Sequence, residues 1–559
     1  MATHAVVEKD LRLFARILAV LAALWLTCAV TARGQQAVPD AGLLRWYQGT
    51  REIGRESFRR TPALFETETQ IPMANLKLRY RSEYDAAGRL ARFEAQAYGL
   101  RTDSLIRTYT LVVAGDTLRM RQVGGRPADT SWVKLARVDA MVPNNSFGAM
   151  LELAERAGPT GGSYVAFSPE ANDTMRYTVT RAGDSLSITL GPLPMTAQLG
   201  PSGKVDRFDV AMQRLRVERW AGGDTIPPLE GAVRPTPDYS APAGAPYTAE
   251  EVRVPVIATT GDTFSLGCTL TIPRGGRASY PALITITGSG LQDRDESLWP
   301  LVPGYRPFRQ VAERVARQGI ATLRCDDRGF GASHGDASRA TSLNFAEDVC
   351  SELAWLQTHP GIDRARIALI GHSEGGIIAP IVAAMHPSLS GIVLMAGTAK
   401  NGVAVLEDQV RWPIESTPGL SPERRAELRA EAIRRIENDT TSNPWLLFFR
   451  TYDPLTTARR VHVPVLILQG ALDRQVSAGQ ADTLGAAIRA NGNRDVTVRV
   501  FPGLNHLFLH SPTDGSPTEY PSLTDTNVDR GVLDALAQWL TVRLHAVPLP
   551  AAGAQAPRR

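Results

Sequence analysis

Residues 367–376 read IALIGHSEGG, and this stretch decides the fold. An apolar run ends in Gly-x-Ser-x-Gly and a helix-like segment follows, which is the pattern of a nucleophile elbow. A serine hydroxyl is a weak nucleophile unless a sharp turn exposes it to a base and to backbone N–H donors. Gly371 and Gly375 stand where a Cβ would crowd that turn. The five residues alone also occur by chance in glycine-rich loops, but the strand before and the helix after predict Ser373 as a nucleophile.

Two partners of the serine are expected later in the chain, in the order acid then histidine, each on a loop that follows a strand. The apolar run 463–469 is followed by Asp473, and the run 496–501 is followed by a Gly-x-x-His loop that ends at His506. Taken singly, an aspartate after a strand is more often a turn former, and a lone histidine is usually a surface or core residue. Their positions select these two. We expect His506 to take the Ser373 proton and Asp473 to orient the imidazole.

Residues 371–376, Asp473 and His506 together resemble the catalytic set of the α/β-hydrolase superfamily, over roughly residues 246 to 545. Residues 284–296, ITITGSGLQDRDE, are similar to a Gly-Ser-Gly-x-x-Asp-Arg-Asp segment of a group of bacterial carboxylesterases. Thr287 departs from that pattern, because many relatives carry histidine there. The resemblance implies a serine hydrolase that cleaves carboxylic esters through an acyl-enzyme and needs no cofactor.

The glycine-rich segment is interpreted as an oxyanion loop. Acyl transfer develops negative charge on a carbonyl oxygen, and preorganised N–H groups stabilise it. By the superfamily pattern the donors are the backbone N–H groups of Glu374 and Ser289. Residues 293–296, DRDE, are expected either to brace this loop through ion pairs or to be a solvated loop. Residues 325–333 resemble a second loop of the superfamily. The resemblance implies a structural role for this loop, in which it shapes the floor of the site.

Strands and helices alternate through residues 248–545, which predicts a mostly parallel, doubly wound sheet in a catalytic domain. Residues 398–461 break that alternation and are interpreted as a helical cap. Leu291, Trp412, Trp445 and Phe448 are tentative substrate-pocket residues. An amphipathic insertion would bury its aromatic side chains in any case, so this assignment stays open.

Residues 35–225 contain short alternating runs separated by glycine-rich turns, which favour an antiparallel β-rich domain, either a small sandwich or an open barrel. Residues 145–157 are a candidate helix within it. A proline-rich linker is expected at 226–247 and a disordered tail at 546–559.

The first 34 residues have the order of a signal peptide: Lys9, Arg12 and Arg16 precede an apolar run at 17–30 and small residues through Ala32. The run is shorter than the roughly 20 apolar residues of a membrane span. We expect export to the periplasm or the exterior, with no stable membrane span after cleavage. A retained N-terminal anchor is the alternative.

Composition adds mainly exclusions. The formal net charge is +4 with basic residues scattered along the chain, so a nucleic-acid partner is not expected. Beyond the signal segment Cys268, Cys325 and Cys350 remain, an odd count without paired spacing, which favours buried free thiols over disulfides. The sequence has no cluster of histidines and cysteines with metal-ligand spacing, so it predicts no metal site.

A small-molecule acyl ester is therefore the expected substrate, and two alternatives stay open. One is a serine peptidase of the prolyl-oligopeptidase type, although the N-terminal region is short for a propeller of at least four blades of about 40–50 residues each. The other is a non-catalytic binding protein on a hydrolase scaffold, which would have kept the three residues without using them.

Overall fold

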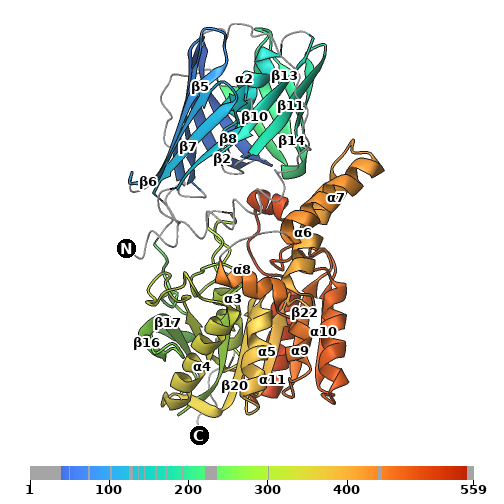
Figure 1. Cartoon of the computed structure of the whole chain (residues 1–559). Helices are drawn as coiled ribbons and strands as arrows, with labels where there is room; N and C mark the ends of the chain where they lie inside the picture. The colour runs from blue at the N-terminus through green and yellow to red at the C-terminus, as the bar shows by residue number, and fades with distance from the viewer. Residues whose placement is uncertain are drawn as a thin grey trace. The chain divides into compact units, whose positions relative to one another are not determined.

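The apolar run before the elbow becomes β20 (Ile362–His372), an inner strand of an eight-stranded sheet. The computed structural model describes residues 40–49, 51–72, 76–100, 103–124, 130–135, 138–143, 145–157, 160–169, 173–191, 193–220, 236–299, 301–437 and 443–550. These residues form two compact units (Figure 1). One contains the described residues of 236–412 and 436–550, and the other contains those of 40–235 together with 413–435. The predicted signal segment lies outside the described residues, as does the first part of the predicted linker.

The eight strands of the first unit lie in the order β16-β17-β19-β18-β20-β21-β22-β23. β17 pairs antiparallel with both β16 and β19, and all later pairs are parallel, which confirms the predicted mostly parallel sheet. Every residue of β18, β19, β21 and β22 is buried, as expected for strands covered on both faces. The bounds of the other strands are β16 Tyr247–Ile257, β17 Thr263–Pro273, β18 Tyr280–Ile286, β19 Ala321–Cys325, β21 Gly391–Met395, β22 Val465–Gly470 and β23 Val496–Phe501.

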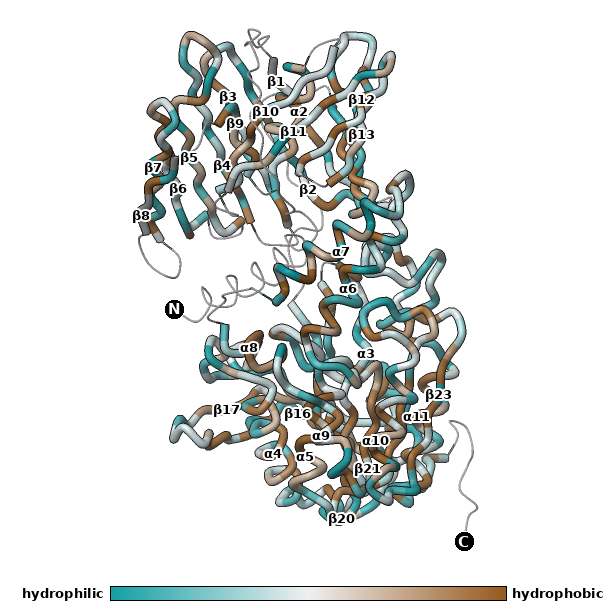
Figure 2. The backbone as a smooth tube through the Cα atoms, turned by 45° about the vertical axis from the view of Figure 1, so that its right-hand side comes forward, coloured by the Kyte–Doolittle hydropathy of each residue, from teal (hydrophilic) through white to brown (hydrophobic). Residues whose placement is uncertain are grey.

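Helices cover both faces of this sheet, and the alternation of strand side chains divides the core into two layers. Ile284 and Leu369 belong to the layer that contains residues of α4 (Ser342–Thr358), α5 (Gly375–Met385) and α10 (Gly479–Ala490). Their neighbours Leu283 and Ala368 belong to the layer with α3 (Pro307–Ala316) and α11 (Arg530–Arg543). Figure 2 shows hydrophobic stretches, in brown, around β21, α10 and α11. The sheet is therefore doubly wound.

The expected insertion at 398–461 is helical. It contains α6 (Gly402–Ser416), α7 (Pro422–Glu437), α8 (Pro444–Thr451) and α9 (Pro454–Ala458). Residues 413–435 of it group with the β-rich unit, where Ile414 and Leu428 are part of the apolar core.

The β-rich unit is one open sheet of fifteen strands rather than two sheets packed as a sandwich. β1 to β8 form one antiparallel meander and β10 to β15 another, and the antiparallel pairing of β1 with β15 joins the two. β9 pairs parallel with β10 at the edge opposite β8. The predicted helix appears as α2 (Gly148–Arg156), whose Leu151 and Leu153 are buried in the apolar core. The strands are β1 Asp40–Gln48, β2 Arg51–Thr61, β3 Leu64–Ile71, β4 Leu76–Tyr84, β5 Leu90–Gly99, β6 Leu105–Ala114, β7 Thr117–Val123, β8 Thr130–Leu135, β9 Ala140–Met141, β10 Gly162–Ser168, β11 Asp173–Ala182, β12 Ser185–Leu190, β13 Leu193–Leu199, β14 Val205–Val210 and β15 Leu215–Trp220.

The cysteine expectation was wrong in part. Cys268 and Cys325 face each other on the antiparallel strands β17 and β19, with Cα atoms 4.0 Å apart, and form a disulfide. They are 57 residues apart in sequence, so only the strand register brings them together. Cys350 is a free, half-buried thiol, and burial raises its pKa to about 11.

Residues 546–550, the first part of the expected disordered tail, are among the described residues. The N–H of Leu549 donates a hydrogen bond of 2.9 Å to the carbonyl of Arg317, just after α3. Residues 551–559 lie outside the described part of the chain. No helix within the described ranges is both long enough and apolar enough to cross a bilayer.

Candidate active site

Ser373 lies at the tip of a tight turn between β20 and α5. Its φ is 53°, in the left-handed region that a non-glycine residue rarely adopts, and its N–H donates to the carbonyl of Met395 at 2.8 Å. A Cβ on Gly371 would overlap the carbonyl oxygen of Gly375, and one on Gly376 would lie 2.6 Å from the Cα of Gly397. The turn therefore has the strained backbone of a nucleophile elbow, with glycines at the positions where a Cβ would not fit.

His506 and Asp473 are joined by a hydrogen bond of 2.8 Å between Nδ1 and Oδ2. Asp473 follows β22 and His506 follows β23, so both lie at the carboxyl edge of the sheet, and both are buried. The other Asp473 oxygen accepts the backbone N–H groups of Gln475 and Val476, each at 2.8 Å. The Nε2 amide of Gln469 donates to the Oδ2 that faces the histidine. These donors fix the carboxylate, so Nδ1 carries the hydrogen and Nε2 of His506 is left as the acceptor.

The histidine ring lies next to the elbow. Its centroid is 4.9 Å from that of His372, the residue directly before Ser373. The Ser373 hydroxyl makes no hydrogen bond within the described part of the chain, to His506 or to any other residue. Catalytic hydrogen bonds are often long in unliganded enzymes and tighten when substrate binds. The fold thus brings the serine, the histidine and the aspartate to the carboxyl edge of the sheet. The serine hydroxyl has no hydrogen-bond partner among the described residues.

The predicted oxyanion loop follows β18 and passes beside the nucleophile. A Cβ on Gly288 would lie 3.2 Å from the Cβ of Ser373. The Gly288 N–H donates to Oε1 of Glu296 at 3.0 Å, whereas the Ser289 N–H has no acceptor among the described residues. Glu374, the other predicted donor, occupies the position before the first residue of α5. Helix N-termini present N–H groups to negative charge, and Glu374 has this position. Ser289 instead lies in the loop that follows β18.

The DRDE segment is buried rather than solvated. Arg294 forms a salt bridge of 3.0 Å with Asp326 and another of 2.6 Å with Glu251. Asp295 is paired with Arg306 and with Arg324. Burial lowers the pKa of Arg324 to about 10. Because a buried charge without a partner is costly, these pairs hold the segment against β19 and the loop after it.

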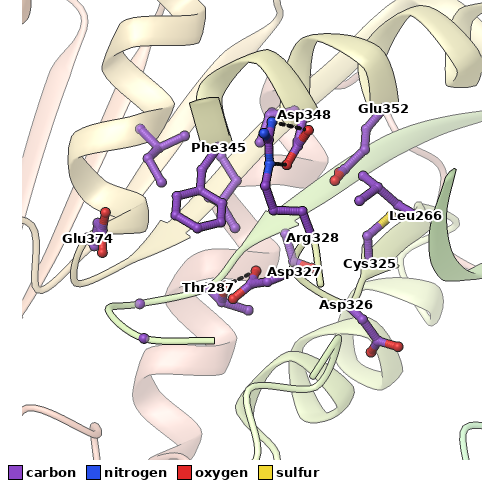
Figure 3. Close-up of a pocket in the computed structure, with 16 residues that line it drawn as sticks. Leu266, Thr287, Cys325, Asp326, Asp327, Arg328, Phe345, Asp348, Glu352 and Glu374 are labelled. Carbon is purple, nitrogen blue, oxygen red and sulfur yellow. Dashed lines mark hydrogen bonds and ion pairs between the residues drawn. The ribbon is translucent and has the colours of Figure 1, made fainter. Parts of the chain in front are cut away.

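A small pocket lined by several acidic side chains includes Glu374, the residue after the nucleophile, in its wall (Figure 3). Arg328 binds Asp348 through two hydrogen bonds of 2.7 Å, and the Thr287 hydroxyl donates to Asp327 at 2.8 Å. Burial raises the pKa of Asp327 and of Glu352 well above the usual range and that of Asp348 to about 6. Within the described residues no group of histidine, cysteine and acidic side chains is arranged to hold a metal ion.

The four tentative pocket residues have different surroundings, and none lines the pocket of Figure 3. Leu291 is buried in the oxyanion loop. Trp412 lies under the guanidinium of Arg474, 3.9 Å from its ring centroid, and Phe448 stacks on Tyr452. Trp445 reaches the elbow, where its Nε1–H donates to Oε1 of Glu374 at 2.7 Å.

The Ser342 hydroxyl donates to the same Glu374 oxygen at 2.6 Å. The side chain that follows the nucleophile is therefore held from two sides, by α4 and by α8 of the helical insertion.

Sequence reasoning missed two residues beside the site. Nδ1 of His372 lies 2.7 Å from Oε1 of Glu296, and its Nε2 lies 2.9 Å from the backbone carbonyl of His506. Burial lowers the pKa of His372, but the attraction and hydrogen bond of Glu296 outweigh it and leave the pKa above the usual value. The only available signal was position, since His372 adjoins Ser373 and Glu296 ends the oxyanion segment.

Comparisons with known proteins concern this part of the chain. Residues 304–513 match the family model described as serine aminopeptidase, S33. Together with the sheet order and the elbow, this match decides the fold. The α/β unit has the α/β-hydrolase fold.

Similar proteins include both esterases and a peptidase. Esterase EstD of Thermotoga maritima is 28% identical over 278 residues, which cover 48% of this chain and 64% of that esterase. Dipeptidyl aminopeptidase BIII of Pseudoxanthomonas mexicana is 26% identical over 267 residues, covering 45% of this chain and 35% of the peptidase. A solved esterase of Pyrococcus furiosus has 15% identity and a TM-score of 0.38, over 56% of this chain and 95% of its own.

Proposed function

We propose that this α/β-hydrolase is an exported serine esterase that cleaves small carboxylic esters through an acyl-enzyme. The observation that carries the proposal is the buried Asp473–His506 hydrogen bond, whose imidazole lies 4.9 Å from the ring of His372, the residue directly before a serine held in a left-handed turn. A positioned base next to an exposed serine is the arrangement that activates a hydroxyl for acyl transfer. Similarity to the Thermotoga esterase supports the ester as substrate class.

The proposed reaction begins when Ser373 Oγ attacks the acyl carbon and its proton passes to Nε2 of His506. Asp473 accepts the Nδ1–H and stabilises the imidazolium that forms. The N–H groups of Glu374 and Ser289 hold the negative oxygen until the carbon–oxygen bond of the leaving alcohol breaks. The alcohol takes the proton from His506. A water molecule, deprotonated by His506, then cleaves the acyl-enzyme, so no cofactor is required.

Peptidase activity is the main competing function, because the chain is also similar to a dipeptidyl aminopeptidase. The β-rich unit gives this alternative no propeller, since its described residues form one open sheet rather than a ring of small blades. A non-catalytic binding protein is less well supported. It would not need the buried Asp473–His506 hydrogen bond next to a strained serine.

Export is the proposed location, by the N-terminal sequence pattern. The disulfide between Cys268 and Cys325 supports an oxidising compartment, where such bonds persist. Fractionation of expressing cells and intact-mass measurement test this proposal. Mature protein that has lost about 34 residues supports cleavage, and full-length protein in the membrane fraction supports a retained anchor instead.

The function is tested by measuring kcat/KM for aryl esters of graded acyl length beside peptide amides. We expect the wild type to hydrolyse short esters far faster than amides, and Ser373→Ala to lose the activity. Ser388→Ala, at an exposed serine beyond α5, is the matched control and is expected to behave as the wild type. Equal ester hydrolysis by Ser373→Ala and the wild type would end the proposal, and faster amide cleavage would favour the peptidase.

A further inference from the structure

We propose that Glu296 and His372 are a buried positioning pair that holds the histidine loop and the oxyanion loop in place around Ser373. The inference rests on the proposed esterase function and adds two residues to it. Neither side chain is part of the proposed proton path. Their role follows from what they join.

His372 bridges two acceptors. The backbone carbonyl of His506 can only accept a hydrogen bond, so Nε2 of His372 must carry a hydrogen and donate to it at 2.9 Å. On the other side of the ring, Nδ1 lies 2.7 Å from a carboxylate oxygen of Glu296. Both ring nitrogens are therefore occupied by protein groups, and His372 cannot reach the substrate through either of them.

Glu296 joins the oxyanion loop to the same ring. Its Oε1 accepts the Gly288 N–H at 3.0 Å as well as the bond from His372. An oxygen that accepts from two donors is best satisfied when the carboxyl is ionised, which makes Nδ1–H the donor and His372 an imidazolium. The raised pKa of His372 agrees with this assignment. Both side chains are buried, so the ion pair is shielded from water.

The backbone of Glu296 is itself held in an uncommon conformation. Its φ is 58°, and its N–H donates to the carbonyl of Asp293 at 2.8 Å. A non-glycine residue in the left-handed region is strained, and this conformation persists only where the surroundings enforce it. The turn points the carboxylate at His372 and Gly288 rather than toward solvent.

The three bonds connect the three parts that must be in register for acyl transfer. His372 is covalently next to Ser373, Gly288 is next to the predicted donor Ser289, and the His506 carbonyl belongs to the residue whose ring is the base. Displacing one of these groups by about 1 Å is enough to cost roughly 10²-fold in rate. The charged and aromatic groups around His372 are Glu296, Asp473, the His506 ring and the Phe508 ring.

Four variants separate the two bonds of His372. Gln places its amide near Nε2, so His372→Gln keeps a donor for the His506 carbonyl, whereas Asn places its amide near Nδ1 and leaves that carbonyl without one. Glu296→Gln keeps the shape and an acceptor for Gly288, whereas Glu296→Ala removes both bonds. We expect kcat for an aryl ester to fall about 10²-fold in His372→Asn and Glu296→Ala, with KM within about threefold. We expect His372→Gln and Glu296→Gln to recover most of the loss.

The matched control is His462→Gln, at an exposed histidine before β22, with wild-type kinetics expected. The pair has no such role if folded His372→Asn and Glu296→Ala keep kcat within about threefold of the wild type. If those two do not fold, the remaining pair decides. Near-wild-type kcat in both conservative variants supports positioning by hydrogen bonds, and a 10²-fold loss in both overturns it. A wild type without esterase activity would instead remove the proposed function, so the two failures are distinguishable.

Discussion

Ser373 adopts a backbone conformation that serine rarely takes, and the glycines around it make this possible. The residue types at 371, 375 and 376 could be interpreted from the sequence, because only glycine fits where a Cβ would meet backbone. The sequence could not reveal which of its many carboxylates and histidines touch one another. His372 and Glu296 are 76 residues apart, and only the folded sheet brings them within 2.7 Å.

Gly371→Ala tests the steric account of the turn. The added Cβ would overlap the carbonyl of Gly375, so we expect a loss of about 1–3 kcal/mol in the free energy of unfolding, together with lower esterase activity. Gly479→Ala is the control, since nothing lies within 4 Å of its added Cβ at the start of α10. Urea unfolding measures both. An unchanged stability in Gly371→Ala would contradict the account.

Asp473→Asn tests the orientation of the imidazole. The amide would set an N–H against His506 or against the backbone donors of Gln475 and Val476, and it favours the wrong tautomer of the base. We expect kcat to fall by about 10⁴-fold with the fold intact. Steady-state kinetics measure the change, and Asp482→Asn, an exposed position on α10, serves as the control. A loss below about tenfold would remove Asp473 from the proposed triad.

At the scale of elements, the sequence predicted β20, β22 and β23 to within a few residues. β22 is buried along its whole length and reads as an almost continuous apolar run, whereas the edge strand β23 has no buried residue and was recognisable by its alternating sequence. The order and register of the strands could not be predicted from the sequence. β19 inserts between β17 and β18 although the chain passes through α3 first, and this order brings Cys268 opposite Cys325. A disulfide therefore formed from two cysteines whose spacing carries no signal.

The disulfide should stabilise the α/β unit measurably. It closes a loop of 57 residues, for which the chain-entropy model gives about 4 kcal/mol, and measured values are commonly about 2–4 kcal/mol. We expect the Cys268→Ala, Cys325→Ala double variant to be less stable in urea than the oxidised wild type by this amount, and we expect a reductant to lower the stability of the wild type but not that of the variant. Cys350→Ala, which removes the free thiol, is the control. A wild type whose stability does not respond to reductant would argue against the bond.

At the scale of the molecule, alternation of short runs was enough to predict a β-rich unit before an α/β unit. It could not distinguish a sandwich from one open sheet, because both bury one face of each strand. Nor could it predict that residues 413–435 group with the β-rich unit, since their helical pattern does not say which core they join.

The stability of the β-rich unit should depend on pH through Glu56 of β2. Its carboxyl accepts hydrogen bonds from the Ser146 hydroxyl and from the N–H groups of Phe147 and Gly148, at the N-terminus of α2. Burial raises its pKa from 4.5 to about 7. The folded state thus holds the proton more tightly than the unfolded state, so stability is full below pH 4.5 and is lost as pH rises through 7.

The shift corresponds to about 3 kcal/mol. We expect the free energy of unfolding of the β-rich unit, measured in urea, to fall by about this amount between pH 4.5 and 8. The dependence should be flatter in Glu56→Gln and unchanged in Glu83→Gln, at an exposed carboxylate on β4. Equal pH dependence in the wild type and Glu56→Gln would contradict the assignment.

The central claim is that Ser373 is an activated nucleophile, and covalent labelling tests it most directly. An aryl phosphonate is incubated with the wild type, with Ser373→Ala and with His506→Ala, and the adduct is located by peptide mass mapping. We predict one phosphonyl group on Ser373 in the wild type, none on Ser373→Ala, and labelling slowed by several orders of magnitude in His506→Ala. Labelling of another residue, or equal rates in the wild type and His506→Ala, would contradict the account.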